Sequence, residues 1–270
     1  MDKATVEISL ESYTPEVSKT TGEWFVSATD LDFISEGCGI LGTGGGGSVY
    51  SALMHSQEVL HQFPGKRMRI IEATRLGPND RIAMIGLVGT PSVSNERLIS
   101  GDEFALASKE LSKFIGLSSY SAMICGEIGG SNGMRPFAAA TAMDIPIVDG
   151  DPVGRAFPKV DLVLPYIYNM ASPTPAALAD ARGNVLIISL VEDSHRLESI
   201  VRSASVELGF VSALSVAPLS TTVVKQFCCL GGLSFAWFMG REVTLARKRK
   251  VDVAQALVWI RSREKKRIKH

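Results

Sequence analysis

The sequence predicts an α/β protein whose N-terminal part contains a mostly parallel sheet flanked by helices. Between residues 66 and 150, short apolar runs of strand length alternate with longer amphipathic segments, the order in which parallel strands are connected. Loops rich in glycine or acidic residues directly follow two of these runs, as at the carboxyl ends of parallel strands. The composition, 46% hydrophobic and 21% charged, is that of an ordinary globular protein.

The first 66 residues predict a strand over residues 5–10 and two helices. Thr29 and Asp30 are expected to cap a short helix over residues 31–39. A second helix begins at Ser48, a good N-cap residue, and carries Val49 and Leu53 on its apolar side. Four consecutive glycines separate these two helices.

The next segment supplies the parallel strands. The expected strands cover residues 69–72, 81–88, 120–125 and 145–148, and the expected helices cover residues 100–116 and 136–143. The remainder predicts a strand over 161–168, a strand over 185–190, a helix over 194–208, a strand over 210–216, a helix over 220–228 and a last helix from Ser234. We place a domain boundary at residue 160, which gives an N-terminal α/β domain (1–160) and a second, incomplete α+β domain (161–270).

The glycine run, Gly42-Thr43-Gly44-Gly45-Gly46-Gly47, departs furthest from average usage. Exposed N–H groups that lead into a helix N-terminus form an anion site, so a cradle for a substrate carboxylate is the leading interpretation. A structural tight turn is one alternative. Dinucleotide binding is another, although the preceding segment is expected to be helical and Glu72 lies further beyond the glycines than the roughly 20 residues that this fingerprint requires.

Three carboxylates follow predicted strands. Glu127 comes after the strand that ends at Cys125, and Asp149 and Asp151 come after the next strand. A carboxylate at a strand end is partly desolvated, which raises its pKa towards that of a useful general acid or base. Asn132 and Arg155 could each donate to an anion or to a ring carbonyl. The structural alternatives are a helix cap for Glu127 and an Asx turn for either aspartate.

Composition excludes several classes of protein. No apolar run reaches the about 18 residues of a membrane span, and residues 1–7 lack the apolar core of a secretory signal, so we expect a cytoplasmic protein. Formal net charge is zero, with 11 basic and 3 acidic residues in 241–270. We attribute this bias to a solvated terminal helix or the stub of a longer chain and not to nucleic-acid binding. The four cysteines have no metal-ligand spacing; no metal site is predicted, although the aspartate pair is compatible with a divalent ion.

Taken together, several motifs resemble the S-methyl-thiohydantoin desulfurase family, which is found beside or fused to hydantoinase/oxoprolinase proteins. They are residues 40–48 with Tyr50, residues 89–91, residues 100–103, residues 127–130 with Asn132, residues 148–151 with 154–158, and residues 173–175 before 178–180. Ser48 stands where an acid is common in the family, and Cys125-Gly126 replace a more usual small apolar pair. The family's C-terminal domain is expected to continue past Arg241, so the resemblance implies a truncated chain.

The resemblance implies hydrolytic removal of sulfur from a small cyclic thiohydantoin, or a related step in hydantoin or oxoproline catabolism. On this interpretation Glu127 or Asp149 is the base, Asp151 or Arg155 orients the ring, and the amides of Gly44 to Gly47 hold a substrate carboxylate. No cofactor is required. Two alternatives stay open: a non-catalytic subunit that docks on a hydantoinase/oxoprolinase-like partner, and a nucleotide-binding protein. A homo-oligomer is compatible with either.

Overall fold

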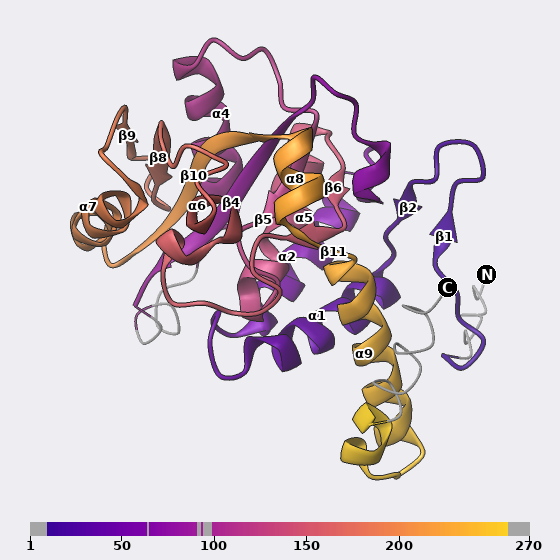
Figure 1. Cartoon of the computed structure of the whole chain (residues 1–270). Coiled ribbons are helices and arrows are strands. Elements are labelled where there is room, and N and C mark those ends of the chain that lie inside the picture. Colours follow the sequence, from indigo (N-terminus) through magenta and orange to yellow (C-terminus); the bar gives the residue numbers. More distant parts are fainter. Residues whose placement is uncertain (1–9, 64, 91–92, 94–98, 259–270) are drawn as a thin grey trace.

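A nine-stranded mixed sheet organises the part of the chain that the computed structural model describes, residues 10–63, 65–90, 93 and 99–258. The strand order is β1-β2-β3-β6-β5-β4-β10-β8-β9, so β1–β2 and β8–β9 lie at opposite ends of the molecule (Figure 1). The strands are β1 (Glu16–Val17), β2 (Trp24–Phe25), β3 (Arg69–Ile71), β4 (Arg81–Gly89), β5 (Ala122–Cys125), β6 (Ile147–Val148), β8 (Ala176–Ala179), β9 (Val185–Ile188) and β10 (Val211–Ser220). A two-stranded sheet pairs β7 (Gly150–Asp151) with β11 (Cys229–Leu230).

Helices connect the strands and cover both faces of the large sheet. They are α1 (Ala28–Gly42), α2 (Val49–Gln62), α4 (Asp102–Phe114), α5 (Arg135–Met143), α6 (Leu164–Ile167), α7 (Ser194–Glu207), α8 (Thr221–Phe227) and α9 (Gly232–Lys248). Short 3-10 turns are η1 (Ala73–Arg75), η2 (Gly130–Gly133) and η3 (Val160–Leu162). None of these helices is long and apolar enough to cross a membrane.

The centre of the sheet is parallel, as predicted. Strands β3, β6, β5 and β4 all run in one direction. The C-terminal half then extends the same sheet through β10, which pairs antiparallel with β4 and places Leu214 opposite Gly86. The two halves of the chain therefore share one continuous sheet.

Side-chain alternation along the strands separates two apolar layers. In β4, Ala83 and Ile85 face the layer that packs against α1, α2, α4, α5 and α9. The intervening Ile82 and Met84 face the layer that packs against α6, α7 and α8. This is the two-sided burial that parallel central strands require.

Three local predictions are corrected. The first helix is longer than expected, because Ser27 is its N-cap and forms a capping box with Asp30. Residues 161–168 form η3 and α6 instead of a strand, with Pro165 in the first turn of the helix, where its missing N–H costs nothing. Strand β8 was not predicted, because its four buried residues include three alanines and show no alternation. The strand expected over 5–10 lies, except for Leu10, outside the described residues.

Helices α1 and α9 cross at very close range (Figure 1). A Cβ atom added at Gly37 would lie 1.9 Å from the backbone oxygen of Ala236, and one added at Gly240 would lie 1.8 Å from that of Phe33. Trp237 of α9 also donates an indole hydrogen bond of 2.8 Å to Asp30 of α1. The crossing therefore depends on glycine at both positions.

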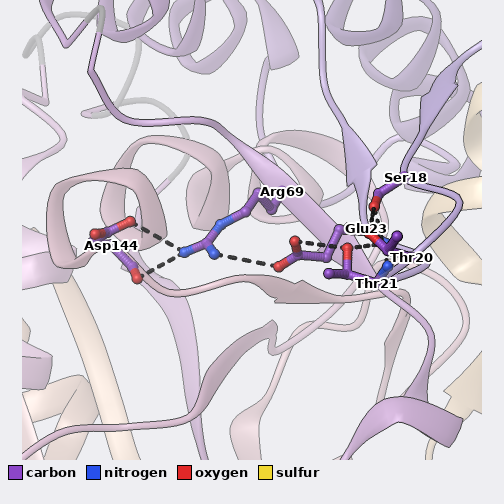
Figure 2. A network of polar contacts seen from close by, with 6 residues as sticks. All are labelled: Ser18, Thr20, Thr21, Glu23, Arg69 and Asp144. Atoms are coloured by element: carbon purple, nitrogen blue, oxygen red, sulfur yellow. Dashed lines mark hydrogen bonds and ion pairs between the residues drawn. The ribbon is translucent and has the colours of Figure 1, made fainter.

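Arg69 of β3 connects the edge of the sheet to the end of α5. Figure 2 shows its guanidinium between Glu23 on one side and Asp144 on the other, at 3.3 and 3.1 Å. The second carboxylate oxygen of Glu23 accepts a hydrogen bond from Thr21 at 3.0 Å. These contacts fix the β1–β2 ribbon against the parallel strands.

Candidate functional site

A cavity of about 470 Å³ opens at the carboxyl end of β4. Its walls come from the loop between α1 and α2, the end of β4, the loop after β5, residues 153–160, helix α7 and strand β10. Ligands in open α/β sheets bind at such carboxyl ends. The cavity is thus built from both halves of the chain.

The loop Gly42–Gly47, called the glycine loop below, forms one wall. Gly46 and Gly47 have positive φ angles of 73° and 76°, and a Cβ at Gly46 would lie 2.1 Å from the backbone oxygen of Gly129. Ser131 holds the loop in place, because both its N–H (2.8 Å) and its hydroxyl (2.9 Å) donate to the Gly46 oxygen. Glycine is required at position 46 because a Cβ atom would collide with the backbone of Gly129 and because the φ angle is positive.

Within the described part of the chain, the N–H groups of Gly46 and Gly47 have no hydrogen-bond acceptor, whereas that of Gly45 is bonded to the Gly42 oxygen at 2.7 Å. Helix α2 begins directly afterwards with Ser48 as its N-cap, as predicted. Gly45, Gly46, Gly47 and Thr43 line the cavity, and Gly44 does not. The loop therefore presents free donors and a helix N-terminus on this side.

Of the three carboxylates that follow predicted strands, Glu127 is the one that lines the cavity. Only 8% of the residue is exposed. One carboxylate oxygen accepts a hydrogen bond of 2.5 Å from the Asn132 side chain, and the other accepts one from the Phe157 N–H. Asn132 is itself oriented by the N–H of Leu87, which donates to it at 2.7 Å. Burial raises the pKa of Glu127, while the donors Phe157 and Asn132 partly oppose that rise.

Arg155 and Thr43 form another part of the cavity wall. Arg155 donates a hydrogen bond of 3.3 Å to the Thr43 hydroxyl, and its guanidinium lies 5.9 Å from the centre of the Phe157 ring. Both residues are exposed and both line the cavity. They connect the glycine loop to the segment whose Phe157 N–H holds Glu127.

Helix α7 supplies a charged pair that the sequence did not predict. Arg202 and Glu198 form an ion pair of 2.6 Å; Arg202 also donates to the Pro158 oxygen, and Glu198 accepts from the Val160 N–H at 2.9 Å. Both line the cavity. The available signal was their i,i+4 spacing on an amphipathic helix, but nothing in the sequence placed that helix beside Glu127.

A comparison with protein-family models shows the family to which this chain belongs. The model "S-Me-THD-like, N-terminal domain" matches residues 29–190, and "S-Me-THD-like, C-terminal domain" matches residues 192–267. The chain belongs to the S-Me-THD-like family. Because both domains of the S-Me-THD-like family match, the expectation of a truncated C-terminal domain is not supported. The boundary that we expected near residue 160 stays a prediction.

The fold of this S-Me-THD-like protein is also that of a crystal structure of a protein from Chromobacterium violaceum. The two share 22% sequence identity with a TM-score of 0.72, over 87% of this chain. The chain spans 64% of the length of that protein, and the likeness shows the fold alone. No curated protein matches the chain.

Asp149 and Asp151 of this S-Me-THD-like protein do not line the cavity. Asp149 caps α9: it accepts hydrogen bonds from the N–H groups of Leu233 (2.8 Å) and Ser234 (3.1 Å) and from the Ser234 hydroxyl. The structural alternative that we gave for Asp149 was an Asx turn, and the structure shows a helix cap in its place. Burial raises the pKa of Asp149, and its three donors oppose that rise.

Asp151 instead ties together the two loops beside Glu127. One of its oxygens accepts backbone hydrogen bonds from Ile128 (3.1 Å), Val153 (3.0 Å) and Gly154 (2.6 Å). The residue is fully buried, and burial raises its pKa to about 6. Asp151 therefore holds two loops of the site together without lining the cavity, so its predicted part in orienting the ring would be indirect.

Metal ligands do not gather at this site. Across residues 10–63, 65–90, 93 and 99–258, no group of three or more His, Cys, Asp or Glu side chains is placed to hold an ion. The four cysteines are free, and Cys125 is fully buried, where burial raises its thiol pKa. Cys125 is thus a core residue and not a cavity thiol.

Proposed function

We propose that this protein hydrolyses the C–S bond of a small cyclic thiohydantoin, with Glu127 as the general base. The observation that supports this proposal is the placement of Glu127, a desolvated carboxylate held by two neutral donors, in a cavity beside free backbone N–H groups. Glu198, the other buried carboxylate of the lining, is instead ion-paired with Arg202. Hydrolysis needs these two functions in one place: a base for the attacking water and donors for the charge that develops on the ring. Family membership supports the same substrate class.

The reaction balances with water as the only co-reactant. The oxygen of a water molecule forms a bond to the ring carbon that carries sulfur, the electron pair of its C=N double bond moves to the ring nitrogen, and Glu127 accepts a proton from that water. The remaining hydroxyl proton passes to that nitrogen as the carbonyl forms, the C–S bond breaks, and the proton on Glu127 passes to the departing thiolate. A cyclic ureide and a thiol are released, and Glu127 is again a carboxylate.

Chain residues around Glu127 have separate tasks in this scheme. Each carboxylate oxygen uses one lone pair on Asn132 or Phe157 and keeps another for water. The N–H groups of Gly46 and Gly47 face the negative charge of the substrate, whether that charge develops on the ring or belongs to a carboxylate. Arg155 adds a positive charge at the cavity wall. No metal or cofactor is invoked in any step.

The variant Glu127→Gln tests the assignment. The amide keeps the size of the side chain but cannot accept a proton, so we expect kcat for an S-methylthiohydantoin to fall by about 10²- to 10⁴-fold. Thiol release is followed with a thiol-reactive dye. In the wild-type protein the rate should rise with pH through the raised pKa of Glu127, because the base acts only when deprotonated.

Glu207→Gln, which alters an exposed carboxylate at the end of α7, is the matched control and should leave both rate and pH profile unchanged. Folding of each variant is checked by urea unfolding. A folded Glu127→Gln protein with unchanged turnover would show that Glu127 is not the base.

A further inference from the structure

A glycine interrupts the apolar side of β4 where the strand passes under the cavity. Gly86 lies between Met84 and Val88 on the same face of the strand and opposite Leu214 of β10. If a Cβ atom were added there, its nearest neighbour would be the Asn132 side-chain oxygen at 4.0 Å. Apart from its chain neighbours, no other described atom lies within 4 Å of that Cβ, and Gly86 lines the cavity.

The walls around this space are apolar. Met84, Val88, Val163, Leu214 and Val216 line the cavity and belong to the apolar layer between the sheet and α6, α7 and α8. We call these residues the apolar end of the cavity and Glu127, Asn132 and the glycine loop its polar end; Asn132 lies where the two meet, because its side-chain oxygen is the neighbour of Gly86. The cavity therefore has one end that suits ring chemistry and another that suits hydrocarbon.

Two charged groups of α7 that line the cavity already have partners, whereas Lys159, which also lines it, is exposed and has no side-chain partner among the described residues. Arg202 and Glu198 bind each other, and each also bonds a backbone group of residues 158–160. A polar substituent placed there would have to compete with these bonds, whereas an apolar one leaves them intact. The apolar side chains and the bonded α7 pair thus favour hydrocarbon, and Lys159 is the charged group that a polar substituent would use instead.

Size leads to the same conclusion. A cavity of about 470 Å³ lies in the range of about 300–1,000 Å³ that holds drug-sized ligands. A five-membered ring with a methylthio group would occupy the polar end and leave the apolar end unfilled. Each further methylene buried there should tighten binding about fourfold.

We propose that the substrate ring carries an apolar substituent, about the size of a leucine or phenylalanine side chain, which lies over Gly86 against Met84, Val88 and Leu214. This inference rests on the proposed function, because it specifies the substituent on that same ring. Gly86 is then the specificity-determining position, since it keeps the floor of the cavity open.

The first experiment compares rings on the wild-type protein. S-methylthiohydantoins with hydrogen, methyl, isobutyl or benzyl at the ring carbon remote from sulfur are assayed for thiol release, and the corresponding hydantoins are titrated by calorimetry. We expect kcat/KM for the isobutyl and benzyl rings to exceed that for the unsubstituted ring by at least about tenfold, with the calorimetric affinities in the same order.

The second experiment introduces side chains at position 86, which lines the cavity. Gly86→Ala and Gly86→Val place side chains of increasing size in the cavity, and neither meets a backbone atom within 4 Å at its Cβ. We expect KM for the isobutyl ring to rise at least about tenfold in Gly86→Val and less in Gly86→Ala. KM for the unsubstituted ring should rise by a clearly smaller factor; some rise is expected because the added side chain also approaches Asn132, the residue that holds Glu127. Gly65→Val, at an exposed turn position with open space around it, is the matched control, and thermal unfolding confirms that each variant folds.

The outcomes separate this inference from the proposed function. Equal turnover of substituted and unsubstituted rings, or an equal loss of both in Gly86→Val, would overturn the apolar subsite while the hydrolytic function stands. If none of the rings is bound or hydrolysed by the folded wild-type protein, the proposed function fails and this inference fails with it.

Discussion

Asp151 should make the stability of the protein depend on pH in a way that a single substitution removes. Its carboxylate is fully buried and accepts three backbone hydrogen bonds through one oxygen, while the other oxygen has no partner in the described part of the chain. Burial is the largest influence on this group and raises its pKa to about 6 from an ordinary 3.8; the three donors only partly offset it.

The sign of the effect follows from proton binding in the two states. Below pH 3.8 the carboxyl group is protonated whether the chain is folded or not. Between 3.8 and about 6 only the folded chain keeps the proton, so stability falls as pH rises. Above about 6 both states are ionised. At about 1.4 kcal/mol per pH unit, the full loss is about 3 kcal/mol.

Asp151→Asn should abolish this dependence. The amide oxygen can accept the same three N–H bonds, and the amide nitrogen takes the place of the unpartnered oxygen, at a cost of about 1–3 kcal/mol that does not vary with pH. Relative to wild type, the variant should therefore gain about 3 kcal/mol as pH rises from about 3.5 to 7.5.

Urea unfolding, followed by tryptophan fluorescence at several pH values, measures the difference between the two proteins. Other carboxylates with raised pKa values, such as Glu127 and Asp149, add a similar pH dependence to the unfolding free energy of both proteins. Their contributions therefore largely cancel in the difference. Glu207→Gln, at an exposed position, should track wild type throughout. A difference between wild type and Asp151→Asn that stays constant across this pH range would refute the reasoning.

Two further predictions concern α9. Gly240→Ala should cost about 3 kcal/mol in urea unfolding, because the new methyl group would meet the backbone of Phe33; a change below about 0.5 kcal/mol would show that the α1–α9 crossing is not tight. Asp149→Ala should cost about 2–4 kcal/mol, because it leaves buried donors of α9 unpaired. The exposed cap variant Asp193→Ala on α7 should cost only about 1 kcal/mol, and equal costs for the two caps would contradict the buried role of Asp149.

The sequence correctly predicted several structural features that depend mainly on neighbouring residues. The Ser48 cap, the parallel strands around β5 and the helix before the glycine run follow from capping preference, strand-length apolar runs and periodicity, all of which act over a few residues. The same rules failed at residues 161–168, where Pro165 favours a helix start, and at β8, where small residues are buried without alternation.

The sequence by itself determined the family, the parallel centre of the sheet and a set of strand-end carboxylates. It could not separate Glu127 from Asp149 and Asp151, because all three follow apolar strands and differ only in which distant N–H groups they meet. The tertiary structure decided that one faces a cavity, one caps α9 and one fixes two loops. It alone also brought α7 and β10 over β4 and left Gly86 uncovered, because contacts between segments far apart in the chain depend on packing and not on local preference.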